Sequence, residues 1–375
     1  MNKIKRLLSD ISIKLKSFVS RESLFEVLRT LVAILIAIIV VIIIIFFVSE
    51  TPMNTIKVFF LYPFTDEYSR SEIISRATPL IFSGLAAAFM LRAKQFNLFG
   101  EGAFFIGGLV GAIVAIYFHL PIILLPLVAI LISGLTGGII GSVPAILKSK
   151  WKVNEFVVSL MMNFIVMWIG IFFLANVFND PTAGDITTQI IPEAGRIPFI
   201  GEMSLVSLGI FLALLMTIFS HLFFYHTRFG YKMKMTGDNL DFASYSGIKT
   251  SRPIFYSQVI GAGIASVGGA TEVLSNYTRF NWKSLPGYGF DGFMIAIIAK
   301  NKPLGILLVS LFFGYIRTGA NQMAIFTDVS SEIVVILQSV VILLVAAQAF
   351  LQSYRKKFMA VKIKQLQNMD IKVVK

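Results

Sequence analysis

The chain has 375 residues, of which 56% are hydrophobic and only 14% are charged. This composition leaves too little polar surface to keep a globule of that size in water, so lipid is the expected solvent. The sequence contains no cysteine, which excludes disulfides, thiolate metal sites and thiol catalysis.

The formal net charge of +13 comes largely from the two ends of the chain. Residues 1–29 and 353–375 each carry seven lysines and arginines. The positive-inside bias assigns both basic tails to the cytosol, where anionic head groups of membrane lipids attract them. This explanation accounts for the imbalance, and we expect no nucleic-acid partner.

Between the tails, uninterrupted apolar runs predict an all-α integral membrane protein. The run from Leu31 to Val48 holds 18 residues without a charge, which nearly crosses a hydrocarbon core of roughly 30 Å. The transmembrane domain is expected over residues 30–352. Its ten predicted helices cover residues 30–48, 77–91, 102–118, 122–147, 155–178, 204–225, 254–274, 289–299, 304–325 and 333–352.

An even number of helices places both termini on the same side, and the loops on that side hold most of the remaining lysines and arginines. Both termini are therefore predicted to be cytosolic. The segments 77–91 and 289–299 are short for a full crossing, so we expect them to be broken or tilted and lined by protein.

A weak internal repeat relates the two halves of the domain. Pro79 opens a helix that is followed by Phe96–Ala103, and Pro253 opens one that is followed by Gly287–Gly292. Each pair places a glycine-flanked acid before a new helix. A duplication of helices two to five and seven to ten would resemble transporters with a central pathway, but so short a similarity also arises by chance.

Two loops are predicted on the outer side. Residues 179–203, rich in proline and glycine, indicate an ordered surface loop. Residues 275–287 contain Tyr277, Phe280 and Trp282. At a helix end we expect these aromatic residues to be interfacial anchors, and stacking on a ligand is the alternative.

The long inner loop, residues 227–252, carries the most specific local pattern. Asn239 is a good N-cap, Asp241 falls in the first turn, and Gly247 suits a left-handed helix stop. These residues predict a helix of about two turns outside the membrane, too short to be stable without a docking surface. An ordinary cytosolic connector is the alternative.

The same loop resembles the coupling segment of bacterial ABC-importer permeases of the branched-chain amino acid, ribose and nucleoside superfamily. Their pattern Gly-x-Asn-x-x-Ala-Ala-x-x-x-Gly-Ile is matched by Gly237, Asn239, Ala243, Gly247 and Ile248, and Phe242 replaces the first alanine. The segments 96–102, 154–163 and 287–293, the last followed by 301–305, are similar to the nucleoside-type branch. The resemblance covers roughly residues 76–350.

This resemblance implies a permease subunit that moves nucleosides across the bacterial cytoplasmic membrane by alternating access. It also implies an ATPase subunit, a second permease in a heterodimer and an extracytoplasmic substrate-binding lipoprotein as partners. The coupling contacts would involve Gly237, Asn239, Asp241, Ala243 and Gly247. ATP and magnesium would be used by the ATPase, because this chain contains no Gly-x-x-x-x-Gly-Lys-Ser/Thr motif. We expect the chain itself to be no enzyme and to bind no cofactor.

Polar residues that we expect to be buried are the candidates for the substrate pathway: Asn97, Glu101, Asn163, Asp291 and Arg317. Arg317 would cost about 2.5–3.5 kcal/mol in lipid, so it should face protein or water and pair with Asp291 or Glu101. The two acids alternatively complement helix dipoles. Asn163 lies about 13 Å into its helix, where its amide needs a partner.

Other functions remain open at this level. An importer of ribose-like sugars or of a flavin would carry the same motifs. An ion-coupled secondary transporter needs acids near the middle of the membrane, which are scarce here, and a membrane enzyme needs clustered histidines or acids. The three histidines are isolated and lack any metal-binding spacing.

Overall fold

The computed structural model describes residues 39–201, 204–330, 332–336 and 338–340. The chain divides into a large central unit, Val58–Gln322, and a smaller unit formed by the segments on either side of it. Within the smaller unit, Ser49 follows the helix Ile39–Val48, and its hydroxyl donates to Asp328 Oδ1 at 2.7 Å. The basic tails 1–29 and 353–375, and parts of the first and last predicted helices, lie outside the described residues.

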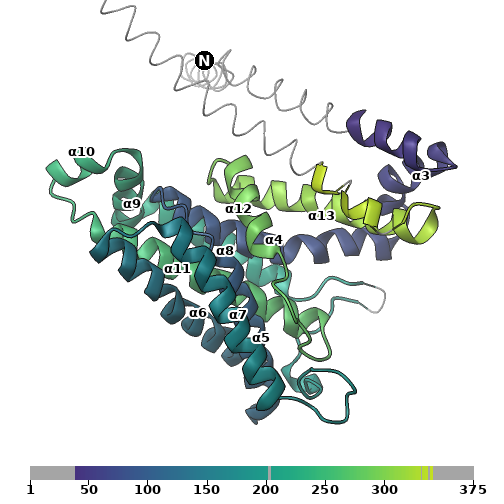
Figure 1. Cartoon of the computed structure of the whole chain (residues 1–375), viewed down its shortest axis with the longest axis horizontal. Helices are drawn as coiled ribbons and strands as arrows, with labels where there is room; N and C mark the ends of the chain where they lie inside the picture. The colour runs from purple at the N-terminus through teal and green to yellow at the C-terminus, as the bar shows by residue number, and fades with distance from the viewer. Residues whose placement is uncertain (1–38, 202–203, 331, 337, 341–375) are drawn as a thin grey trace, which may run out of the picture. The chain divides into compact units, whose positions relative to one another are not determined.

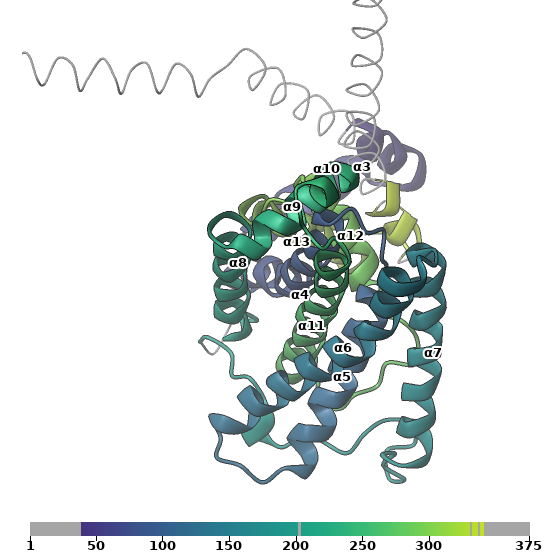
Figure 2. The same ribbon diagram turned by 90° about the vertical axis from the view of Figure 1, so that its left-hand side faces the viewer.

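The described ranges contain helices and no strand (Figures 1 and 2). Two 3-10 turns lie at Tyr62–Phe64 and Glu193–Gly195. The helices are α3 (Pro52–Phe60), α4 (Glu67–Arg92), α5 (Gly100–Tyr117), α6 (Leu124–Trp151), α7 (Glu155–Asn176), α8 (Gly209–His226), α9 (Arg228–Asp238), α10 (Leu240–Tyr245), α11 (Ser251–Asn276), α12 (Tyr288–Ile298) and α13 (Pro303–Phe326).

Six of these helices, α4 to α8 and α13, are long and apolar enough to cross a membrane. The prediction of an all-helical membrane protein is confirmed to that extent. The total of ten crossings and the cytosolic position of both termini stay predictions.

Helix α11 has 26 residues and forms the centre of the bundle, between α4 and α6 in Figure 2. It packs against α4, α5 and α6, and small residues allow that close approach. A Cβ on Gly269 would lie 1.9 Å from Phe104 O, and the Ser266 hydroxyl donates to Ala103 O at 2.6 Å. A helix surrounded by protein tolerates such polar and small residues, which explains why α11 is less apolar than α5 and α6.

The prediction that the segment 77–91 is a short helix was wrong. Helix α4 begins at Glu67 and runs for 26 residues. Its first turns carry Ser69 and Glu72, which lower the local hydropathy, yet both are buried because other polar side chains satisfy them. Gln322 Nε2 donates to Ser69 Oγ at 2.8 Å, and Arg76 pairs with Glu72 at 2.6 Å. The other short segment is indeed a helix of 11 residues, α12.

The inner loop 227–252 contains two helices where the sequence analysis predicted one. The additional helix, α9, begins after Thr227, whose hydroxyl accepts a hydrogen bond from Gly230 N at 3.0 Å. The prediction missed this N-cap.

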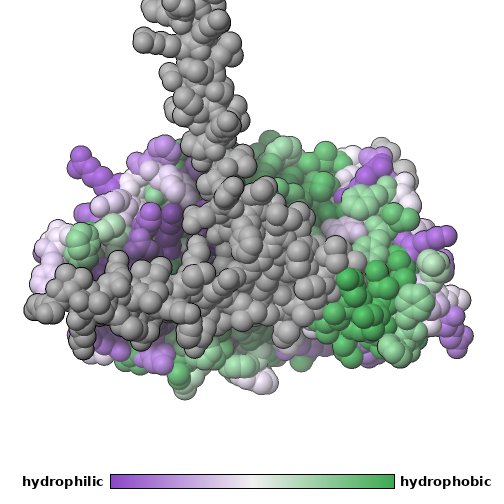
Figure 3. All heavy atoms as spheres, turned by 90° about the horizontal axis from the view of Figure 1, so that it is seen from above, coloured by the Kyte–Doolittle hydropathy of each residue, from purple (hydrophilic) through white to green (hydrophobic). Residues whose placement is uncertain are grey.

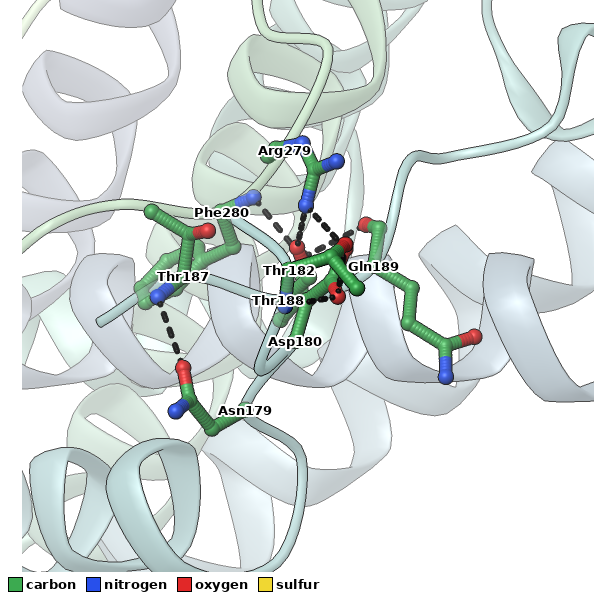
Figure 4. A network of polar contacts seen from close by, with 8 residues as sticks. All are labelled: Asn179, Asp180, Thr182, Thr187, Thr188, Gln189, Arg279 and Phe280. Atoms are coloured by element: carbon green, nitrogen blue, oxygen red, sulfur yellow. Dashed lines mark hydrogen bonds and ion pairs between the residues drawn. The ribbon is translucent and has the colours of Figure 1, made fainter. Parts of the chain in front are cut away.

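The predicted ordered loop after α7 is anchored to the chain that follows α11 (Figure 4). Arg279 donates to Asp180 at 2.5 Å and to Thr188 O at 3.0 Å. Thr188 N donates to Phe280 O at 3.1 Å, and Phe280 N donates to the Thr188 hydroxyl at 3.0 Å. The loop therefore forms a fixed surface at the end of the bundle opposite α10.

Phe280 and Trp282 are not the interfacial anchors that their place at a helix end suggested. Both are buried, Phe280 fully. Their rings pack on Phe105 and Phe104, with centroids 5.6 Å and 5.9 Å apart respectively. The aromatic residues of this segment hold the outer loop against the helix bundle.

The pH dependence of the loop anchor follows from Asp180. Hydrogen bonds from Thr182 and Arg279 hold the pKa of the Asp180 carboxyl well below its ordinary value of 3.8, at about 2. Because the folded-state pKa is depressed, the contribution of this group is complete above about pH 3.8 and is lost as the pH falls through about 2. We expect a spin label at Ile190→Cys to be immobile at neutral pH and to gain mobility only as the pH approaches 2.

The variant Arg279→Ala should mobilise the same label at neutral pH, since it removes the ion pair and the bond to Thr188 O. The matched control is Lys283→Ala, because the pair of Lys283 with Asp185 is about half exposed on both sides and exposed pairs contribute little. Equal mobility in both variants would contradict the anchoring role of Arg279.

Candidate functional site

The connection between α4 and α5 is fixed by buried side-chain amides. Asn163 of α7 donates to Leu98 O at 3.0 Å and accepts from Gly102 N at 2.8 Å. Asn97 donates to Gln258 of α11 at 2.6 Å and accepts from Phe99 N at 2.8 Å. The amides of Asn97 and Asn163 are thus committed to protein partners and hold the start of α5 in place.

Glu101 lies at the start of α5 and is fully buried. Its carboxylate accepts hydrogen bonds from the backbone N–H groups of Gly287 and Gly289, both at 2.5 Å, and of Phe290 at 3.2 Å. These groups belong to the N-terminus of α12, where free N–H groups and the helix dipole favour a negative charge. Glu101 therefore complements the dipole of a different helix from its own.

Close backbone packing accompanies this contact. A Cβ on Gly289 would lie 2.3 Å from Glu101 N, so no larger residue fits there. Gly287 has φ +86°, a left-handed conformation that glycine adopts without strain. The two segments that the weak repeat relates, 96–103 and 287–292, thus pack directly against each other.

Arg317 of α13 pairs with Asp291 of α12, as the sequence predicts. About one fifth of each side chain is exposed. The guanidinium also lies over the ring of Tyr288, 5.3 Å from its centroid. The ion pair and the cation–π contact together explain how an arginine is accommodated in this helix.

Additional charged residues, which the sequence analysis missed, lie near this pair. Glu272 of α11 is buried, accepts from Asn276 at 2.9 Å and lies 3.4 Å from the Tyr288 hydroxyl. Tyr288 links Glu272 to Arg317, because its hydroxyl lies near the Glu272 carboxyl and its ring lies under the Arg317 guanidinium. We call the five charged residues from four helices the charged cluster: Glu72, Arg76, Glu272, Asp291 and Arg317.

Aromatic rings adjoin the charged cluster. Tyr288 packs on Phe104 with centroids 5.0 Å apart, and Phe104 stacks on Trp282 with an interplanar angle of 20°. Tyr277 meets Trp282 edge to face at 5.7 Å. Charged groups and aromatic rings are therefore adjacent in this part of the bundle, and Phe104 and Trp282 are buried there.

The residue pattern within each helix did not predict that Glu272 and Arg76 belong to the charged cluster. Glu272 stands near the end of α11, which reads as an ordinary boundary, and Arg76 stands before the predicted start of its helix. Both Glu72 and Arg76 were missed because the predicted helix started ten residues too late. Helix α4 begins at Glu67, which places Glu72 and Arg76 inside the bundle.

The coupling segment has the local geometry that its sequence predicts. The Asn239 side chain accepts from Phe242 N at 3.0 Å and caps α10, with Asp241 in the first turn. Gly247 has φ +78°, and Ile248 N donates to Ala243 O at 3.0 Å to close the helix. Gly237 touches the end of α4, where a Cβ would lie 2.2 Å from Arg92 O.

Helix α10 buries Ala243 and exposes apolar side chains. Leu240 and Phe242 are about half exposed, and Tyr245 is 92% exposed. A helix of only six residues is marginally stable alone, and its exposed apolar side chains indicate a surface for contact with a partner. Among the residues that the structure describes, no cluster of histidines and acids could hold a metal ion.

Comparison with known proteins identifies the family. A family model described as the permease component of branched-chain amino acid transport systems matches residues 69–346. The guanosine ABC transporter permease protein of Bacillus subtilis (strain 168) is 31% identical over 312 residues, which cover 80% of this chain and 86% of that protein.

Two further relatives carry other substrates in their names. The glucose ABC transporter permease protein of Haloferax volcanii is 27% identical over 81% of this chain and 83% of its own length. The probable riboflavin import permease protein of Treponema pallidum (strain Nichols) is 23% identical over 86% of both. The family model matches most of the chain, and six of the described helices are long and apolar enough to cross a membrane. This chain therefore belongs to the branched-chain amino acid permease family of ABC transporters and is a multi-pass membrane subunit.

Proposed function

We propose that this chain is the permease subunit of a nucleoside importer, working by alternating access with an ATPase, a second permease and an extracytoplasmic binding lipoprotein. The observation that carries the proposal is the 31% identity with a guanosine permease over four fifths of the chain. A sugar or a flavin is the second candidate, because relatives named for glucose and riboflavin match over similar lengths.

The substrate pathway in this proposal passes the charged cluster and Tyr288. A nucleoside has a flat base and a ribose with hydroxyl groups. Tyr288 is partly exposed and offers an aromatic contact to the base, and Arg76, whose side chain is about one third exposed, offers a donor for the hydroxyls. Arg317 and Asp291, each about one fifth exposed, complete this set. Asn97, Glu101 and Asn163 act as positioning residues, because they are buried and bonded to the protein.

Uptake competition tests the substrate class. A strain that lacks this permease should lose uptake of labelled guanosine and recover it when the gene is restored. Unlabelled nucleosides in excess should compete, and ribose, glucose and riboflavin should not. Competition by one of these last compounds but not by nucleosides would replace the proposed substrate.

Arg317 provides a test of the pathway. The variant Arg317→Leu leaves Asp291 without its counter-charge, so uptake should fall about tenfold or more, since one unpaired partly buried charge easily costs the roughly 1.4 kcal/mol of that factor. Arg317→Lys keeps the charge but loses the planar fork, and should retain partial activity. Uptake is measured at matched membrane expression.

The control for this test is Arg70→Leu. Arg70 is an exposed arginine of the first turn of α4, with a bond to Phe64 O at 3.4 Å. Normal uptake by Arg317→Leu would remove Arg317 from the pathway.

The coupling helix provides a separate test. Asn239→Ala removes an N-cap that stabilises a helix by about 0.5–2 kcal/mol, and Gly247→Val forces a β-branched residue into φ +78°. We expect both variants to insert in the membrane. The number of substrate molecules transported per ATP hydrolysed should fall several-fold. The matched control is Ser244→Ala, an exposed position on the same helix. Wild-type coupling in both variants, with the ATPase still bound, would refute this role of α10.

A further inference from the structure

A cavity of about 950 Å³ lies at the end of the central unit that carries α9 and α10. Three separate stretches line it: the last turns of α6, the first turns of α9, and the chain from Gly247 into α11. These elements meet at the left-hand end of Figure 1, and Figure 3 shows hydrophilic side chains gathered at that end. The positive-inside bias predicts that this end faces the cytosol.

The cavity lining is strongly basic. Lys150 comes from α6, Lys232 from α9, and Lys249 and Arg252 from the stretch around the start of α11, and no lining residue is acidic. None of the four forms an ion pair within the part of the chain that the structure describes. Four converging cations repel one another, so a bound anion stabilises this arrangement.

Aromatic side chains form another part of the wall. The rings of Phe229 and Tyr256 meet edge to face, with centroids 5.6 Å apart. Tyr256 is about half exposed, so its ring and its hydroxyl are both accessible. A tyrosine beside lysines is typical of the boundary between the hydrocarbon and the head groups of a bilayer.

An exposed apolar stripe of α6 leads toward this cavity. Leu131, Leu135, Ile139 and Val143 are spaced four residues apart, and each is between 43% and 69% exposed. Residues at this spacing share one helix face. The same face continues through Ile146 to Lys150, which both line the cavity.

We propose that this cavity binds the head group of an anionic phospholipid, with its phosphate among the four cations and an acyl chain along the stripe of α6. Charge complementarity selects an anion, and the stripe selects a lipid over a soluble phosphate. Because Lys249 lies two residues after Gly247, the bound lipid also fixes the chain where it leaves α10. This site does not depend on which substrate the permease carries.

Lipid binding is measured on the complete importer in detergent, titrated with phosphatidylglycerol or phosphatidylcholine, by native mass spectrometry. The parent protein should bind phosphatidylglycerol in preference. The pair Lys232→Gln and Arg252→Gln should weaken this binding by roughly tenfold or more, given the usual effect of two basic residues near an anionic head group. Millimolar inorganic phosphate should not displace the lipid.

The matched control is the pair Arg228→Gln and Lys234→Gln, which removes one arginine and one lysine from α9 outside the cavity. It should change binding less than twofold. If the first pair fails to insert, Lys249→Gln should still weaken binding, and the exchange Lys232→Arg with Arg252→Lys should preserve it.

Three results would overturn the proposal. An equal loss in the control pair would indicate general surface charge. Displacement by inorganic phosphate would indicate a soluble anion. Loss of the ATPase from the cavity variant, with lipid binding unchanged, would indicate a protein contact.

Discussion

The hydrogen bonds between the Glu101 carboxylate and the start of α12 are the constraint on which this bundle depends. A bilayer offers no water to backbone N–H groups, so the first turn of a short internal helix needs acceptors from the protein. Glu101 supplies them to three N–H groups at once. Burial of a carboxylate is itself unfavourable, and these charge-assisted bonds offset that cost.

The rest of the site is arranged around that contact. Asn163 and Asn97 hold the backbone that leads into Glu101, and Gly289 permits the close approach of α12. With α12 fixed by its N-terminus, Tyr288 and Asp291 project toward Arg317, as their contacts show. The charged cluster therefore has a defined geometry although its members come from four helices.

Sequence patterns predicted those parts of the structure that depend on local chemistry. Asn239 and Gly247 determine α10 through a cap and a left-handed stop, and both lie within the few residues that they control. Arg317 allowed an ion-pair partner to be predicted, because a lone arginine in an apolar helix requires one. Glu72 and Glu272 gave no comparable signal, because a buried acid near a helix end is indistinguishable from an exposed one until the neighbouring helices are known.

The same limit explains the errors in the helices. Hydropathy describes contact with lipid, and α4 and α11 contact mainly protein. The polar first turns of α4 were therefore assigned to a loop. Phe280 and Trp282 were assigned to the membrane interface for the converse reason, since their burial depends on Phe104 and Phe105, more than 170 residues earlier in the chain.

The contact between Glu101 and α12 also limits which helices can move relative to each other. Pulling α5 away from α12 would strand one carboxylate and three N–H groups in a medium without water, at about 1–3 kcal/mol for each orphaned group. These two helices must therefore travel as a single rigid block. Any interface that opens during a transport cycle has to lie between other helices, where separation costs less free energy.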